Sequence, residues 1–198
     1  MLSLDIRTLL SRCFLLLPIT VLASCGGGGN DVPWRAFSTT LAGGQEVPPN
    51  SSIGTAIGVI TVNRDNNIMY ASVVVNGVNE TAVYLQEGQP GINGPIVFSL
   101  YREASSGVWI ASAALSATQW GSLRAGNYYF NVLSTTFPGG ELRGQLFRQP
   151  PAPEQLNLLQ RLRSQSPQID RQLDAIRQIE EGGDWHHSGA GIGISIGF

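Results

Sequence analysis

The stretch TAIGVITVNRDNNIMYASVVV, residues 55–75, decides the fold class, because it contains two strand-forming runs around one turn. Residues 55–62 and 68–75 are rich in Val, Ile and Thr, side chains that favour β-structure. Between these runs lie the four residues RDNN at 64–67, and Asp and Asn side chains suit a tight hairpin turn. The stretch therefore predicts an antiparallel β-hairpin.

Similar short runs continue along the chain and are separated by segments containing Gly, Pro, Asn or Ser, which are typical of turns. The further predicted strands cover 81–86, 95–102, 108–115, 127–134 and 141–147. One short helix fits between the strands at 108–115 and 127–134. There Ser116 and Gln119 have the spacing of a capping box, and Trp120 would face the core. Seven or eight strands at this spacing predict a mainly β fold, an antiparallel, Greek-key-like β-sandwich or barrel.

The composition changes at residues 149–153, QPPAP, where proline prevents a sheet from continuing and predicts a stiff linker after a β-domain at 34–148. Beyond the linker, Leu and Ile recur at helical spacing through residues 154–181. Ser166 suits a helix N-cap, with Pro167 in the first helical position. We expect two short amphipathic helices, which either fold back on the β-domain or meet a partner.

The first 24 residues have the pattern of a secretory signal peptide. Two arginines, Arg7 and Arg12, precede an apolar run at 13–22 that is too short to remain as a transmembrane helix. The run ends in Leu22-Ala23-Ser24-Cys25, which matches the bacterial lipobox, and four glycines follow the cysteine. We therefore expect cleavage before Cys25 and lipid attachment to it.

Residues 25–33 would then form a lipidated cysteine with a flexible, glycine-rich tether. Lipid chains on Cys25 would anchor the chain stably. No Asp follows Cys25, which favours the outer membrane, its periplasmic face or the cell surface over retention at the inner membrane. The predicted location is thus an exported, membrane-anchored lipoprotein.

Charge and cysteine content exclude two classes of function. Removal of residues 1–24 would leave Cys25 as the one cysteine, so neither disulfides nor thiol chemistry are expected. The same removal would leave ten Arg, no Lys and thirteen acidic residues, which offers no basic face for nucleic acid. The chain is therefore not expected to bind DNA or RNA.

Three separated segments resemble the CHRD domain, a module named from the animal protein chordin and also found in bacterial secreted proteins. Residues 41–50 read LAGGQEVPPN, residues 88–95 read GQPGINGP, and residues 129–132 and 138–146 read YFNV and PGGELRGQL. The resemblance implies structural roles for the residues that carry it: Glu46, Pro48, Pro49, Gly91, Asn93, Gly94, Asn131, Pro138, Gly139, Gly140, Glu141, Arg143 and Gly144.

The resemblance also indicates where a metal site would lie. Many bacterial members carry a His-x-His before the glycine loop and a third His after the Asn-Val of the penultimate strand, a set suited to Cu or Zn. In this sequence those positions hold Tyr84, Gln86 and Leu133, none of which is a good ligand for these metals. We therefore expect the family scaffold without its imidazoles, and no cofactor.

Catalytic residues are not predicted either. Residues 30–150 contain no His and no Cys, so the usual general base and thiol nucleophile are missing there. The acidic side chains fall mainly in turns and at strand ends. Glu141 and Arg143 stand two apart on one predicted strand, and together with Glu46 and Arg124 they suggest a structural ion-pair network rather than a ligand site.

The last segment, residues 182–198, is rich in Gly and Ile and contains His186 and His187, which are weak candidates for a metal site. Three functions follow from the sequence. The first is a membrane-anchored, non-catalytic binding or structural module whose partner is another envelope protein or surface component. The second is a Cu- or Zn-binding redox protein. The third is an assembly module whose Gly-Ile tail adds a strand to a partner.

Overall fold

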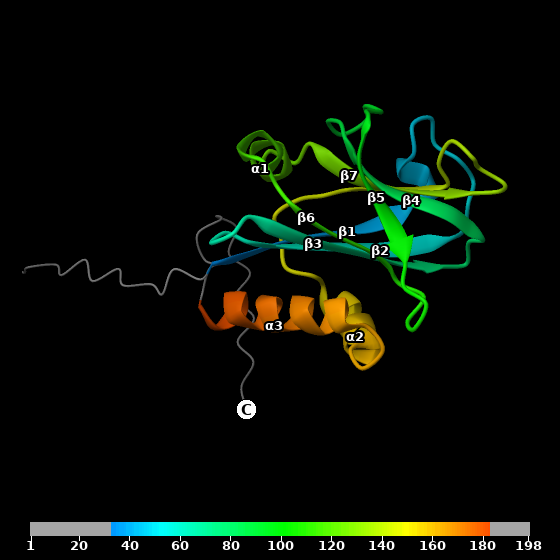
Figure 1. Cartoon of the computed structure of the whole chain (residues 1–198). Helices are drawn as coiled ribbons and strands as arrows, with labels where there is room; N and C mark the ends of the chain where they lie inside the picture. The colour runs from blue at the N-terminus through cyan, green and yellow to red at the C-terminus, as the bar shows by residue number, and fades with distance from the viewer. Residues whose placement is uncertain (1–32, 183–198) are drawn as a thin grey trace, which may run out of the picture.

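The described part of the chain, residues 33–182 of this computed structural model, is a β-barrel with two helices packed along one side (Figure 1). The strands are β1 (Trp34–Ala42), β2 (Thr55–Asn63), β3 (Ile68–Asn76), β4 (Glu80–Glu87), β5 (Ile96–Arg102), β6 (Trp109–Ala114), β7 (Tyr128–Ser134) and β8 (Leu142–Gln145). The helices are α1 (Ala117–Arg124), α2 (Pro153–Leu162) and α3 (Pro167–Glu181), and a single 3-10 turn, η2, spans Gly43–Gln45.

All strand pairs are antiparallel, and the barrel closes in the order β1-β2-β3-β6-β5-β4-β7-β8. Strands β4, β5 and β6 follow one another as neighbours, yet β6 pairs with β3 and β4 pairs with β7. The connections from β3 to β4 and from β6 to β7 therefore join strands that are not neighbours, as in a Greek key. The predicted fold class, a mainly β, antiparallel, Greek-key-like barrel followed by helices, is confirmed.

The β2–β3 hairpin forms where the opening stretch predicted it. Asn63 pairs with Ile68 at its end. The turn is stabilised by its own polar side chains, because Asn63 Oδ1 accepts from Asp65 N over 2.9 Å and Asn66 Oδ1 accepts from Ile68 N over 3.0 Å. Asn67 has φ 55, a left-handed conformation that Asn tolerates. Local side-chain chemistry therefore fixes this hairpin.

The first strand, β1, was missed by the sequence-based prediction, which expected seven or eight strands and gave ranges for seven. Its sequence WRAFSTTLA mixes apolar and small polar residues without a clear alternation. The reason is that both faces are covered. Phe37 and Leu41 point into the barrel, whereas Ala36 packs in a second apolar layer with residues of α2 and α3. Strand β1 closes the barrel by pairing with β2 along nine residues and with β8 at Ala42 and Arg143.

Helices α2 and α3 pack on the barrel of the same chain, so the structure shows the first of the two arrangements left open by the sequence. Their apolar residues meet the outer face of the strands in a layer made by Ala36, Val59, Val108, Ile110, Leu159, Ile169, Leu173, Ile176 and Ile179. Ser166 Oγ accepts from Ile169 N as the predicted N-cap, and Gly182 caps the end of α3. Buried Gln172 also donates to the Tyr70 carbonyl and accepts from Ser72 Oγ.

The proline-rich segment 149–153 is docked against β1, which corrects its prediction as a stiff spacer. Ser38 Oγ donates to the Pro150 carbonyl over 3.1 Å, and Gln149 Nε2 donates to the Ser38 carbonyl over 3.0 Å. Pro153 is already the first residue of α2. The prolines therefore end the sheet and lead the chain directly into the helical layer.

Helix α1 has the predicted capping box, with Ser116 and Gln119 each bonding the other's backbone. Trp120 turns toward the core and meets Phe37 edge to face, with ring centroids 6.1 Å apart. Over residues 33–182, no helix is long and apolar enough to cross a membrane.

Candidate functional site

The motif residues of β4, β7 and β8 meet on the outer face of the barrel, away from α2 and α3. Side chains alternate along each strand, so Val83, Leu85, Phe130 and Val132 fill the interior while their neighbours point outward. The pairing register aligns the outward residues in two rows, Tyr84, Asn131 and Arg143 in one and Gln86, Tyr129 and Gln145 in the next. We call Tyr129, Asn131, Arg143 and Gln145, together with Glu46 and Asn93, the motif cluster.

Arg143 is the centre of the motif cluster and is only 2% exposed. Its Nη1 donates to Asn93 Oδ1 over 2.9 Å, and its Nη2 donates to the Ile92 carbonyl over 3.0 Å and to Gln145 Oε1 over 3.1 Å. Its Cζ lies 3.4 Å from the centroid of the Tyr129 ring, a close cation–π contact. The buried charge of Arg143 is thus stabilised by oriented polar groups and by the face of the Tyr129 ring.

These contacts hold the glycine loop, residues 88–95, against the barrel. Gly94 N donates to Tyr129 Oη over 3.0 Å, and Gln145 Nε2 donates to the Gly88 carbonyl over 2.9 Å. Asn93 Nδ2 reaches the first motif and donates to the Val47 carbonyl over 2.7 Å. Because Asn93 bonds both Arg143 and Val47, it joins the glycine loop, β8 and the loop after β1.

The loop after β1 is held at its other end by Asn50 and Ser52. Asn50 Nδ2 donates to the Glu141 carbonyl over 3.0 Å, and Ser52 Oγ donates to Glu141 Oε1 over 2.6 Å. Sequence reasoning missed Asn50, Ser52 and Gln145 as contributors. Asn50 and Gln145 lie within the motif segments. Their polar side chains close to charged motif residues are the feature of the sequence that could have indicated this role.

Of the predicted ion-pair network, the interaction between Glu46 and Arg143 is present, since the charge of Arg143 lowers the pKa of Glu46, whereas the other predicted partners differ. Glu141 accepts from Ser52, and Arg143 makes its hydrogen bonds to amide and carbonyl oxygens rather than to a carboxylate. Arg124 is not part of this cluster, because its Cζ lies 5.9 Å from the Trp120 ring centroid on α1. The hydrogen bonds of this single guanidinium thus go to several neutral groups that converge on it.

Glu46 and Asn131 are the members of the motif cluster whose buried oxygens lack hydrogen-bond partners. Each is 6% exposed, and Glu46 Oε1 and Asn131 Oδ1 are buried without a hydrogen-bond partner. Burial raises the pKa of Glu46 from 4.5 to about 7, although the charge of Arg143 and a hydrogen bond from the Val47 backbone oppose the shift. The side chain of Glu46 therefore takes up a proton near neutral pH.

The comparison with known families decides what this barrel is. A family model, the CHRD domain, matches residues 37–146, more than half of the chain and nearly the whole barrel. The chain belongs to the CHRD domain family. The resemblance seen in the three motifs is thereby confirmed, and the structure shows that these motifs form one cluster of the CHRD domain. No curated protein and no solved structure matches the chain.

The three positions at which the resemblance places histidines lie on the outer face of β4 and β7, with Leu133 opposite Ala82 rather than opposite Tyr84 or Gln86. Tyr84 and Gln86 point to the same side, as predicted for residues two apart on a strand. Gln86 Nε2 is engaged with the Gly94 carbonyl over 3.0 Å. Across the described residues 33–182, no group of three His, Cys, Asp or Glu side chains could hold a metal ion.

The remaining predicted residues, Cys25, His186 and His187, lie outside the residues that the structure describes. Of the motif prolines, Pro48 follows a cis peptide bond from Val47, and Pro138 lies in the turn between β7 and β8. The glycine-loop member Gly91 and the turn member Gly140 have positive φ angles of 79 and 141. The motif residues thus lie in loops and turns, in the motif cluster or, as Gly144 does, within β8.

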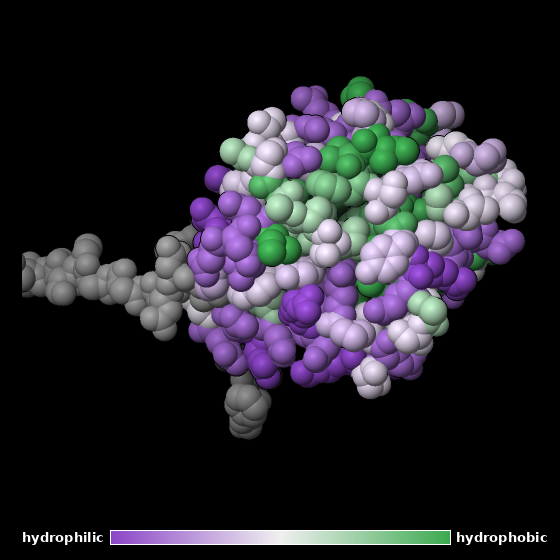
Figure 2. Space-filling view, in the orientation of Figure 1, coloured by the Kyte–Doolittle hydropathy of each residue, from purple (hydrophilic) through white to green (hydrophobic). Residues whose placement is uncertain are grey.

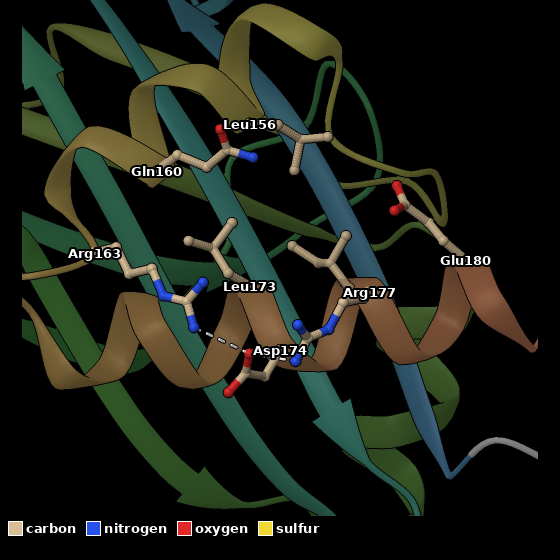
Figure 3. Close-up of a pocket in the computed structure, with 8 residues that line it drawn as sticks. Leu156, Gln160, Arg163, Leu173, Asp174, Arg177 and Glu180 are labelled. Carbon is tan, nitrogen blue, oxygen red and sulfur yellow. Dashed lines mark hydrogen bonds and ion pairs between the residues drawn. The ribbon is translucent and has the colours of Figure 1, made fainter. Parts of the chain in front are cut away.

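A separate groove of about 320 Å³ lies between α2 and α3 on the far side of the helical layer (Figure 3). Leu156 and Leu173 point into it, while Arg163 and Arg177 both bond Asp174 Oδ1, over 3.3 and 3.0 Å. These charged groups are 40–61% exposed and are paired with one another. The groove therefore has neither a buried unpaired polar group nor a deep apolar floor, and we assign no function to it.

The protonation of Glu46 makes the stability of the CHRD barrel depend on pH. The folded carboxyl has a pKa of about 7, whereas the ordinary value is 4.5, so the folded state holds a proton that the unfolded state releases between these values. The free energy of unfolding therefore falls as pH rises from about 4.5 to about 7 and is constant above. Glu46→Gln should remove this slope and stabilise the barrel at pH 8 by about 1–3 kcal/mol.

Urea unfolding of the wild type and of Glu46→Gln at pH 5 and pH 8 measures the effect. Comparison at each pH cancels the contribution of other groups, including Glu180, whose pKa is raised by burial and by Glu181. Glu103→Gln is the matched control, because this carboxylate lies in the β5–β6 turn, bonded to Ser106. Equal pH slopes in the wild type and Glu46→Gln would contradict the prediction.

Proposed function

We propose that this protein is a bacterial envelope lipoprotein, held at a membrane by lipid on Cys25, whose CHRD barrel is a non-catalytic binding or structural module. The lipobox-like Leu22-Ala23-Ser24-Cys25 and the glycine tether that follows it support the anchoring. The expected location is the outer membrane, its periplasmic face or the cell surface. The expected partner is another envelope protein or surface component.

The observation that carries the non-catalytic assignment is the chemistry of the family's metal positions. Tyr84, Gln86 and Leu133 share the outer face of β4 and β7, and they offer a phenol, an engaged amide and an aliphatic group instead of three imidazoles. The polar groups of the motif cluster beside them form hydrogen bonds that hold the glycine loop and the loop after β1 against the barrel. A Cu or Zn redox centre therefore has no ligand set at this place.

A binding role is supported by the side of the barrel that α2 and α3 leave open. Ile92 of the glycine loop and Ile96 and Tyr101 of β5 are 58%, 51% and 61% exposed. Figure 2 shows hydrophobic residues gathered over the upper part of the barrel, whereas the helical layer below is hydrophilic. Exposed aromatic and aliphatic residues of this kind are typical of contact surfaces for other proteins.

Two measurements on one pair of proteins test the proposal. The full chain and its Cys25→Ser variant are expressed in a bacterium that processes lipoproteins, and membrane and soluble fractions are compared. We expect the wild type in the membrane fraction with a mass increased by acyl chains, and the variant without lipid in the soluble fraction. Membrane retention of unlipidated Cys25→Ser would overturn the anchoring.

The soluble Cys25→Ser protein is then titrated with Cu²⁺ and Zn²⁺. We expect no stoichiometric binding at micromolar affinity. Tight binding would replace the non-catalytic assignment with the metal-dependent alternative. Substitution of both His186 and His187 by Ala then separates the two metal locations. Loss of binding in this variant would place the metal in the tail, whereas persistence would place it on the barrel.

A further inference from the structure

One end of the barrel is joined to the tether that leads back to Cys25. Strand β1 begins at Trp34, which pairs with Asn63 next to the β2–β3 turn. The Pro33 carbonyl accepts a hydrogen bond from Arg64 N over 2.7 Å, which fixes the chain beside that turn. Helix α1 lies at the same end, because Leu115 N donates to the Asn67 carbonyl over 2.9 Å. We call this the tether end.

The tether can span at most about the length of one barrel strand. Residues 26–33 separate Cys25 from Trp34. At full extension this segment spans about 30 Å, and a glycine-rich chain is shorter than that on average. If Cys25 carries lipid in the bilayer, the tether end must stay within this distance of the headgroups. The opposite end, with the β5–β6 turn, is one strand length farther along the barrel.

The tether end displays arginines over an aromatic ring. Arg64 Cζ lies 5.7 Å from the centroid of the Trp120 ring, and Arg124 Cζ lies 5.9 Å from the same centroid. Both arginines are exposed, and Trp120 is half-buried. The one acidic side chain in the adjacent turn is Asp65, which is exposed.

A second group of the same kind lies where α3 covers the start of the barrel. The rings of Trp34 and Tyr70 are 6.1 Å apart, and Arg171 Cζ is 4.9 Å from the Tyr70 ring centroid. Two aromatic groups with three guanidiniums thus occur near the point where the tether joins. Guanidinium forks match phosphate oxygens, and Trp and Tyr are favoured at the boundary between water and lipid.

We propose that the tether end lies against the membrane, with Arg64 and Arg124 on anionic phospholipid headgroups and Trp120 beside them. This orientation rests on the proposed lipidation of Cys25 and adds the surface that meets the bilayer. It directs the β5–β6 turn away from the membrane, toward partners. The guanidiniums supply attraction worth about 1 kcal/mol each near an anionic surface, so salt weakens it.

Fluorescence quenching on the lipidated full-length protein tests the orientation. Single cysteines replace Asp65 in the turn of the tether end or Ser105 in the β5–β6 turn, both exposed, and carry a fluorophore. Asp65 contributes only its backbone N–H to the turn, so the hairpin keeps its side-chain bonds. Lipidated Cys25 is a thioether and does not react with the label. The protein is reconstituted into phosphatidylcholine vesicles with one quarter phosphatidylglycerol and a headgroup-bound quencher, and vesicles are recovered by flotation. We expect at least threefold stronger quenching at position 65 than at 105.

The outcomes separate the two proposals. Failure of the protein to float with the vesicles means that the lipid anchor, and hence the proposed function, is wrong. Flotation with equal quenching at both positions, or stronger quenching at 105, overturns the orientation alone. Arg64→Gln with Arg124→Gln should reduce quenching at position 65 at least twofold, whereas Arg102→Gln at the opposite end should leave it unchanged. Unchanged quenching in the double variant overturns the headgroup contact.

Discussion

Replacement of Arg143 by alanine is expected to lower the free energy of unfolding by about 3–5 kcal/mol, a large part of the stability of an ordinary domain. The side chain is 2% exposed and makes hydrogen bonds to Asn93, Ile92 and Gln145. Alanine would leave the buried Gln145 side chain without this donor, would break the bonds that hold the glycine loop and would remove the contact with the Tyr129 ring. Unsatisfied buried acceptors cost more than the bonds themselves contribute.

Lysine at position 143 should rescue little of this loss. The guanidinium donates to four separate groups from two nitrogens while its plane covers the Tyr129 ring. An ammonium is a single point of charge on a flexible stem and cannot reproduce that fork or the stacking. We therefore expect Arg143→Lys to lie closer to Arg143→Ala than to the wild type. Recovery of wild-type stability by Lys would show that charge alone matters here.

Thermal unfolding at pH 6 measures both variants, with an expected decrease in Tm of roughly 10 °C for Arg143→Ala. Arg102→Ala is the matched control. Arg102 is 60% exposed and pairs with Glu80 over 3.4 Å, so its loss should cost less than about 1 kcal/mol. Similar Tm values for the Arg143 and Arg102 variants would contradict the structural role of Arg143.

Local features of the fold were predictable because their causes are local. The β2–β3 hairpin depends on Asn63 and Asn66, which bond backbone groups two residues away. The same holds for the Ser116 capping box of α1 and for the Ser166 N-cap of α3. Strand β1 was missed because its residues are buried by elements from the far end of the chain, including segment 149–153.

The site was predictable in part for the same reason. Residue spacing placed Tyr84 and Gln86 on one face of a strand, and the motifs indicated which residues matter. The sequence could not show that Arg143 meets Asn93, fifty positions away, because that contact depends on barrel closure. Charge alone suggested carboxylate partners for Arg143. The barrel supplies amide and carbonyl groups as hydrogen-bond acceptors instead, since the β7–β8 pairing places Arg143 beside the glycine loop that joins β4 and β5.

Replacement of Gly140 by alanine is the second substitution with a large expected effect, about 2–4 kcal/mol of destabilisation. Gly140 has φ 141, a backbone conformation that side chains rarely adopt. A Cβ at this position would lie 2.8 Å from Glu46 Oε1 and 2.7 Å from Asn131 Oδ1, well inside contact distance. Both oxygens are buried, so neither side chain can move into solvent without opening the loop that carries Glu46.

The neighbouring glycine provides the control, because Gly139→Ala changes the same turn by the same methyl group. No atom lies within 4 Å of a Cβ built on Gly139, and its φ is not in the left-handed range. Gly139→Ala should leave stability unchanged or raise it by about 0.4–1 kcal/mol through the unfolded chain. Urea unfolding of both variants measures the difference. If Gly140→Ala were as stable as Gly139→Ala, the close packing of Glu46 and Asn131 around Gly140 would be refuted. If instead Gly140→Ala is destabilised and Glu46→Ala recovers part of the loss in the double variant, the clash with the Glu46 carboxyl is its source.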